Sequence, residues 1–243
     1  MTQSHSAASA VELIATVSHE LRQPLASIRG FTEMLLVHWR DFDDSDKQAM
    51  LREILQDSVR ASRLMDDLLE MSRLEVGKLP LHMSECDMAS VLHRSLRNVK
   101  TAYPDLDASV TVALPAGSLL RADPFRMEQV VTNIVENACK YATAGSVVIQ
   151  VGKVEGPRGG CMEVSVSDGG PGIAPEDLPH VTEKFYRGSS GTKRGLGLGL
   201  WISRCIVEAH GGQMEVSSGP AGTTMKFLIP LQPVPTTGKL AGS

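Results

Sequence analysis

Aromatic side chains and positive charge are both scarce in this sequence of 243 residues. Phe, Trp and Tyr make up 4% of the chain, so the core must be built from aliphatic side chains rather than from rings. The 24 Lys and Arg residues are outnumbered by 28 Asp and Glu residues, which leaves no basic excess of the kind that marks a nucleic-acid-binding surface. We therefore expect no nucleic-acid partner.

Cysteines are also few, and none lies in a CxxC pair or beside a cluster of histidines. The spacing therefore gives no support to a metal cage or a dithiol redox motif. We expect all four to be reduced cysteines that pack as small apolar side chains in a cytosolic protein. They are Cys86, Cys139, Cys161 and Cys205.

Long apolar runs are missing as well. No stretch approaches the roughly 20 apolar residues that span a bilayer, and the N-terminus lacks the pattern of a secretory signal. We expect a cytoplasmic chain with no direct membrane contact in this segment. The alternative that it is the cytoplasmic portion of a membrane-bound protein stays open, because an absent segment leaves no trace.

Two stretches near the N-terminus show the apolar spacing of long helices, over residues 11–38 and about 46–76. The polar run at 40–45 predicts a turn, and Gly77 predicts the end of the second helix. An antiparallel hairpin over 11–77 would expose a wide apolar face, so we expect a homodimer with a four-helix bundle. The two apolar seams comprise Ile14, Val17, Leu21, Ile28, Phe31 and Leu35, and Met50, Ile54, Ala61, Leu64, Leu68 and Met71.

From residue 78 to 231 the pattern changes to short β-like runs that alternate with helical ones, which predicts a second domain with helices on a mixed sheet. Residues 1–10 and 232–243 are expected to be a flexible segment and a disordered tail. The predicted strands are 109–114, 146–154, 162–166, 213–217 and 223–229, and the predicted helices are 87–102, 123–142 and 198–210.

Two glycine clusters and one polar helix face carry the chemistry of this second domain. Residues 169–172 follow a strand, and residues 195–200 precede a helix, where glycine lets backbone N–H groups approach phosphate. On the helix from residue 123, the spacing of Asn133, Asn137 and Lys140 places two amides and a cation on one face. Amide oxygens are hard ligands that suit Mg²⁺.

Five segments resemble, in the same order, the motifs of the sensor histidine kinases. Residues 18–25 resemble the H box, 133–141 the N box, 168–173 the G1 box, 183–188 the F box and 195–200 the G2 box. The resemblance implies a helical hairpin that forms a dimeric four-helix bundle, followed by an α/β sandwich of the GHKL ATPase type. It also implies ATP and Mg²⁺ as cofactors, transfer of phosphate to a histidine, and a response-regulator receiver domain as partner.

The resemblance also assigns roles to single residues. Asp168 would accept a hydrogen bond from the adenine amino group. Asn137 would hold Mg²⁺ with Asn133 beside it, Lys140 would neutralise phosphate charge, and Tyr141 would flank the nucleotide. A mobile lid would be framed by Gly170, Gly172, Gly195, Gly197 and Gly199, with Phe185 packed inside it and Arg187 reaching phosphate.

His19 is the nucleophile that the H box implies, and the apolar seam supports this independently. With Ile14 at a and Val17 at d, His19 falls at f and faces away from the bundle core. Neutral imidazole is nucleophilic near pH 7, and Glu20 could hold the ring N–H or accept the released proton.

Two departures from the family pattern stand out. Gln23 replaces the Thr or Asn that many relatives use to position a hydrolytic water, which predicts weak phosphatase activity. The lid segment 189–194 is short and contains two cations. The rival interpretations are another GHKL ATPase or serine kinase, and a scaffold without catalytic activity.

Overall fold

The structure is a computed structural model that describes residues 2–77, 79–102, 110–114, 117–142, 147–156, 159–188 and 195–232, with side chains from residue 15 onward except at 101–102. The chain divides into two compact units. The first consists of residues 1–70 with 192–196, and the second of residues 71–191 with 197–243. The predicted tail at 232–243, apart from its first residue, and the lid segment 189–194 lie outside the described residues.

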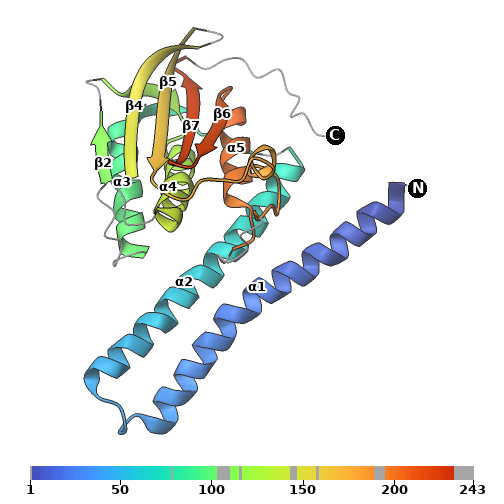
Figure 1. The fold of residues 1–243 in the computed structure, drawn as a ribbon, viewed down its shortest axis with the longest axis vertical. Coiled ribbons are helices and arrows are strands. Elements are labelled where there is room, and N and C mark those ends of the chain that lie inside the picture. Colours follow the sequence, from blue (N-terminus) through green and yellow to red (C-terminus); the bar gives the residue numbers. More distant parts are fainter. Residues whose placement is uncertain are drawn as a thin grey trace. The chain divides into compact units, whose positions relative to one another are not determined.

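Two long antiparallel helices, α1 (Thr2–His38) and α2 (Asp44–Glu75), are joined by a short turn (Figure 1). Helix α1 begins at Thr2 rather than at residue 11, so residues 2–10 are helical. The side chain of Asp43 caps α2, because its Oδ1 accepts the N–H of Asp46 at 2.8 Å. Gly77, with a φ of 66°, follows the end of α2 as predicted.

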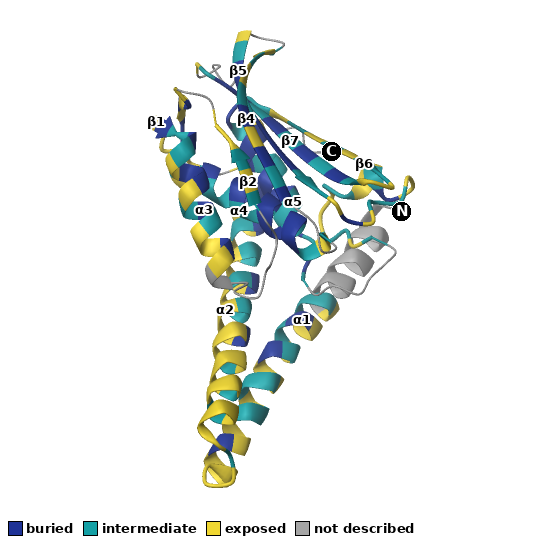
Figure 2. Cartoon of the chain, turned by 60° about the vertical axis from the view of Figure 1, so that its left-hand side comes forward, coloured by how far each residue is buried: buried dark blue, intermediate teal, exposed yellow. Residues whose placement is uncertain are grey.

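The apolar seams of the hairpin are only partly buried in a single chain. Leu35 and Leu64 are 6% and 5% exposed, whereas the other described seam residues of the first unit are half-buried. Figure 2 shows an exposed surface along α2. Among the helices that the structure describes, none has a stretch long and apolar enough to cross a membrane. The exposed apolar residues on α2 include Leu51, Leu55, Val59, Met65 and Leu69.

The second unit contains a mixed five-stranded sheet in the order β2-β4-β5-β7-β6. The pair β2–β4 is parallel and the other pairs are antiparallel. The helices α3, α4 and α5 cover one face of this sheet (Figure 1), as the sequence predicts. The elements are α3 (Met88–Ala102), β2 (Val110–Ala113), α4 (Pro124–Tyr141), β4 (Val147–Gly156), β5 (Gly159–Asp168), α5 (Gly199–Ala209), β6 (Gln213–Gly219) and β7 (Gly222–Pro230).

The core of the second unit lies between the sheet and these helices. Alternate residues of each central strand point into it, because successive side chains of a strand face opposite sides of a sheet. They include Ile149 in β4, Val164 in β5 and Phe227 in β7, all at most 1% exposed. The opposite face is polar, and there Lys226 lies 3.6 Å from Glu163 and 3.3 Å from Glu215.

Two short strands form a separate antiparallel pair that the sequence analysis missed. They are β1 (Ser84–Asp87) and β3 (Leu119–Ala122), and Cys86 lies opposite Leu120. Both of these side chains are buried, at 1% and 5% exposure. The pair therefore closes the end of the core where α3 and α4 begin.

The last turn of α2 belongs to the second unit rather than to the first. The boundary between the compact units falls after Glu70, whereas the boundary predicted from the sequence falls after residue 77. Met71 and Leu74 in this turn are 8% and 7% exposed. Lys184 also lies 2.7 Å from Glu75 and stacks 5.0 Å from the ring centroid of Trp201 at the start of α5.

A buried histidine joins the start of α4 to the end of α5. His210 is 4% exposed, and its Nε2 accepts the backbone N–H of Asp123 at 3.0 Å. Its Nδ1 lies 2.8 Å from the carbonyl of Ile206 and therefore donates to it. Burial lowers the pKa of His210 below its ordinary value of 6.5, so this ring is neutral in the native state.

Replacing His210 with Gln should lower the free energy of unfolding by about 2 kcal/mol at pH 7.5, because two buried hydrogen bonds are disturbed. The pKa of this histidine is higher in the unfolded chain than in the folded one. The contribution of His210 to the free energy of unfolding is therefore complete above about pH 6.5 and is lost as the pH falls. Urea unfolding of both proteins should therefore show the difference narrowing from pH 7.5 to pH 5. A difference that widens toward pH 5 would contradict this assignment.

Candidate functional site

The polar face predicted on the second domain lies on α4. The carboxylate of Asp123 caps this helix by accepting N–H groups of its first turn at 3.0 and 3.2 Å, and Pro124 occupies a position that needs no N–H donor. Capping fixes where the helix starts and thereby which residues share a face. Asn133, Asn137 and Lys140 are half-buried on that face, and Tyr141 in the last turn is 43% exposed.

The G1 box packs against the C-terminal end of α4. Asp168 is the last residue of β5, and its Oδ1 accepts the N–H of Gly170 at 2.8 Å. A Cβ atom on Gly170 would lie 2.6 Å from the carbonyl oxygen of Tyr141, so only glycine allows this approach. The N box and the G1 box are therefore in direct contact.

The buried thiol of Cys139 lies near the carboxylate of Asp168. Burial raises the pKa of Cys139 to about 11, and the nearby carboxylates of Glu136 and Asp168 add to the shift. Cys139 is therefore a protonated thiol at neutral pH, whereas the reactive form of cysteine is the thiolate. Cys86 and Cys161 are likewise buried, and Cys205 is half-buried.

The turn between β6 and β7 supports the G1 loop, which the sequence analysis did not anticipate. Ser218 Oγ accepts the N–H of Ile173 at 2.8 Å and lies 3.1 Å from the carbonyl of Gly222. A Cβ atom on Gly172 would lie 2.2 Å from the carbonyl oxygen of Gly219. These contacts hold the loop after Asp168 close to the hairpin.

The F box and the G2 box meet through their backbones. The N–H of Phe185 donates to the carbonyl of Gly197 at 3.1 Å. Phe185 has a φ of 61°, a left-handed conformation that strains a bulky side chain, and Gly197 has a φ of 70°. A Cβ atom on Gly197 would lie 2.5 Å from the carbonyl oxygen of Tyr186, so glycine is required there. Strain of this kind is typical of functional loops.

A second contact braces the F box. Tyr186 donates its hydroxyl to Oδ1 of the buried Asp177 at 2.5 Å, and this hydrogen bond raises the pKa of Tyr186 to about 12. Arg187, expected to reach phosphate, is exposed.

The N box and the G2 box are joined by a side chain. Asn133 donates from Nδ2 to the carbonyl of Gly199 at 3.2 Å and to Ser203 Oγ at 3.3 Å. Gly199 is the first residue of α5, so the predicted lid glycine and the predicted amide lie together at this helix end. Ser203 is 0% exposed and was not among the predicted site residues.

The H box lies on α1 in the first unit. His19 is exposed, as its position on the seam predicts. Glu20 is 4% exposed, and its Oε2 lies 3.5 Å from Nη2 of Arg60 on α2. The same Oε2 accepts the N–H of Gly195 at 3.0 Å. Gln23 is half-buried, and its Oε1 has no hydrogen-bond partner in the part of the chain that the structure describes.

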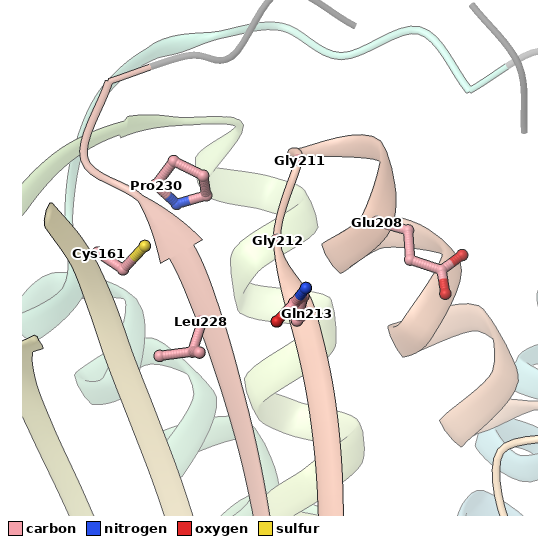
Figure 3. A pocket seen from close by; sticks show the side chains of 7 residues that line it. All are labelled: Cys161, Glu208, Gly211, Gly212, Gln213, Leu228 and Pro230. Atoms are coloured by element: carbon pink, nitrogen blue, oxygen red, sulfur yellow. The ribbon is translucent and has the colours of Figure 1, made fainter. Parts of the chain in front are cut away.

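Among the described residues of the second unit, two hollows of similar size stand out. One of about 250 Å³ borders Asn133 and lies along α4 next to Phe125, which is 82% exposed. The other, of about 230 Å³, lies near the start of β5, far along this strand from Asp168 (Figure 3). The predicted nucleotide residues do not line this second hollow, which is bordered by Cys161, Glu208, Gly211, Gly212, Gln213, Leu228 and Pro230.

Of the residues that contact the predicted site but were missed in the sequence, Ser203 has the clearest sequence signal. It lies between Ile202 and Ile206, both 0% exposed, on the face of α5 that packs into the core. A polar residue on an apolar helix face needs a hydrogen-bond partner, which is a detectable signal. The contacts of Ser218 and His210 leave no comparable trace in the local pattern.

Comparison with known proteins assigns both parts of the chain to families. Residues 9–77 match the family described as "His Kinase A (phospho-acceptor) domain". Residues 122–233 match the family described as "Histidine kinase-, DNA gyrase B-, and HSP90-like ATPase".

Curated relatives align with most of this chain, across both of its parts. The sensor histidine kinase TrcS of Mycobacterium tuberculosis is 33% identical over 93% of this chain and 45% of its own length. The sensor protein SrrB of Staphylococcus aureus is 32% identical over 90% of this chain and 38% of its own length. This chain thus spans less than half of the length of these relatives.

Solved structures of histidine kinases share the fold. AdeS of Acinetobacter baumannii superposes with a TM-score of 0.66, at 24% identity, over 88% of this chain and 98% of that one. ShkA in complex with AMPPNP gives a TM-score of 0.62 at 25% identity, over 92% of this chain and 46% of that one. A mycobacterial sensor histidine kinase, MprB, is 30% identical over 63% of this chain and 99% of its own, with a TM-score of 0.52.

The family predicted from the five motifs is thereby confirmed, as is the predicted order of a helical part and an α/β part. The chain belongs to the sensor histidine kinases, and it contains their phospho-acceptor domain followed by their ATPase domain.

Proposed function

We propose that this chain transfers the γ-phosphoryl group of ATP to His19 and then to an aspartate of a response-regulator receiver domain. The observation that carries the proposal is that the N, G1, F and G2 boxes meet one another through Asn133, Gly170 and Gly197. A phosphoryl transfer depends mainly on positioning and on charge neutralisation. A site of amides, a lysine and backbone N–H groups supplies both.

Asp168 is the residue that selects adenine in this proposal. Its Oδ1 already accepts from Gly170, which leaves the second carboxylate oxygen to accept from the adenine amino group. Guanine carries a carbonyl at the equivalent position, so the carboxylate discriminates between the two bases. Tyr141, at the other side of the contact with Gly170, would flank the nucleotide.

Asn133 and Asn137 are the residues that would hold Mg²⁺, and their amide oxygens have the hard-ligand chemistry that this ion prefers. Bound Mg²⁺ would neutralise charge on the phosphates. Lys140 adds a cation on the same face of α4, one helical turn beyond Asn137. The nucleotide's phosphates would therefore lie along α4 toward the start of α5.

His19 would be the nucleophile, because it is exposed on α1 and histidine is one of the side chains that form covalent intermediates. Glu20 is held between Arg60 and the N–H of Gly195, so its carboxylate has a defined position in the first unit. We assign it the role of receiving or holding the ring proton during transfer.

The homodimer is part of the same proposal. Leu55 and Leu69 on α2 are 65% and 57% exposed, and a surface of this kind in a helical hairpin is covered when two hairpins form a four-helix bundle. The proposal also includes a cytoplasmic location, because the proposed reaction needs ATP and a receiver domain.

Transfer to a receiver domain is the step that tests this function as a whole. The chain would be incubated with γ-labelled ATP and Mg²⁺, freed of nucleotide and then mixed with purified receiver domains. We expect rapid loss of label from the chain and its appearance on one receiver. If the chain hydrolysed ATP but carried no label, another type of GHKL ATPase would be favoured. If it bound no nucleotide, a scaffold without catalytic activity would be favoured.

Gln23 lies four residues after His19 and so on the same side of α1, where its amide is the expected guide for a hydrolytic water. Gln is longer than Asn and more mobile than Thr, and a displacement of about 1 Å can reduce a rate about 100-fold. We expect weak phosphatase activity that increases in Gln23→Thr. Dephosphorylation of a purified phospho-regulator in the presence of ADP would be timed with both proteins, and equal rates would rule this role out.

A further inference from the structure

The side chain of Asn133 is held by two acceptors on α5. The carbonyl of Gly199 can only accept a hydrogen bond, so the nitrogen of the amide must be the atom that faces it, at 3.2 Å. The chemistry of this contact therefore fixes which way round the amide lies. The oxygen of Asn133 is consequently the amide atom that does not face this carbonyl.

Ser203 provides the second acceptor. Its hydroxyl donates to the carbonyl of Gly199 at 2.9 Å, which occupies its single proton. A lone pair on the same oxygen is then directed to accept from Asn133 Nδ2 at 3.3 Å. The two acceptors lie close together as seen from Nδ2, so one N–H of Asn133 is shared between Gly199 and Ser203, and this bifurcated hydrogen bond restrains the rotation of the amide.

We propose that Ser203 is a positioning residue that orients the amide oxygen of Asn133 toward the Mg²⁺ of bound Mg-ATP. The inference rests on the proposed function, because it deepens the role assigned there to Asn133. The hydroxyl of Ser203 is 0% exposed and acts only through Asn133, so it does not itself contact nucleotide or metal. Without it, the shared N–H keeps only the carbonyl of Gly199 as its acceptor, and the amide turns more easily about its last torsion.

The test compares Ser203→Ala with Ser95→Ala. Ser95 is also 0% exposed, and its hydroxyl lies 3.2 Å from the carbonyl of Glu128 on the same helix α4. Both substitutions remove one buried hydroxyl that faces α4, but only the first removes a partner of a site side chain. Binding of AMPPNP would be measured by calorimetry on the full chain, once with Mg²⁺ and once with a chelator.

We expect Ser203→Ala to bind AMPPNP about fivefold more weakly than wild type in Mg²⁺, the factor that corresponds to one ordinary hydrogen bond. In the chelator its affinity should equal that of wild type. Ser95→Ala should match wild type in both conditions. Equal weakening of Ser203→Ala with and without Mg²⁺, or no weakening at all, would overturn the proposal.

A double-mutant cycle separates this inference from the function on which it rests. If Ser203 acts through Asn133, then Ser203→Ala should have no further effect on Mg²⁺-dependent affinity in an Asn133→Ala background. An undiminished effect in that background would overturn the positioning role. If the AMPPNP affinity of Asn133→Ala no longer depended on Mg²⁺ while that of Ser203→Ala depended on Mg²⁺ as in wild type, the inference alone would be overturned. Wild type without nucleotide binding would overturn the proposed function itself.

Discussion

His19→Gln is expected to lose all phosphorylation while it keeps its dimer and its affinity for ATP. The imidazole is the only nucleophile that the proposal places on this face of α1, and its side chain is exposed, so its replacement removes chemistry without disturbing the hairpin seam. Incorporation of label from γ-labelled ATP would be compared with dimer mass by light scattering and with nucleotide affinity by calorimetry.

His38→Gln is the matched control for this experiment. His38 is also an exposed histidine on α1, and its ring lies 3.0 Å from Asp41 at the turn between the two helices. It should retain full phosphorylation. Residual label on His19→Gln, or loss of its dimer, would show that the nucleophile or the seam position has been assigned incorrectly.

Asp168→Asn should weaken ATP binding by about 1–3 kcal/mol while the fold survives, because the substitution places a donor against the adenine amino group. The N–H of Gly170 would keep the amide oxygen on its own side, since only the oxygen can accept from it. The amide nitrogen would then face the adenine donor, and the two N–H groups would repel each other. Calorimetric titration of both proteins with ATP measures the difference.

Asp87→Asn controls for the general effect of losing an aspartate. Asp87 accepts hydrogen bonds from the hydroxyls of Ser90 and Ser118 at 2.8 Å each, and these bonds hold its pKa below the ordinary value. This variant should lose some stability and bind ATP normally. Unchanged ATP affinity in Asp168→Asn would refute the adenine contact.

The parts of the fold that the sequence revealed are those with a long periodic pattern or a specific motif. The helices α1, α2 and α4 were predicted in type and to within a few residues, apart from the early start of α1 at Thr2. The strands β4 and β7 were predicted because alternate residues are apolar and face one core. The expected exposure of His19 followed from the same kind of pattern.

The parts that the sequence did not reveal depend on contacts between distant segments. Strands β1 and β3 are each four residues long, and their pairing depends on the packing of Cys86 against the core rather than on local pattern. Ser203 and Asn133 are 70 residues apart in sequence, and their hydrogen bond exists only because α4 and α5 pack together. The motifs predict the site residues, but the contacts that support them required the structure.

The chemical stability of the phosphorylated chain tests the central proposal most directly. Wild type would be labelled with γ-labelled ATP and Mg²⁺, divided, and treated with acid or with alkali before digestion and peptide mapping. A phosphohistidine at His19 predicts label that is lost in acid, kept in alkali and confined to the peptide containing residues 18–25. Label that survives acid, or that maps to a serine or to another peptide, would contradict the account.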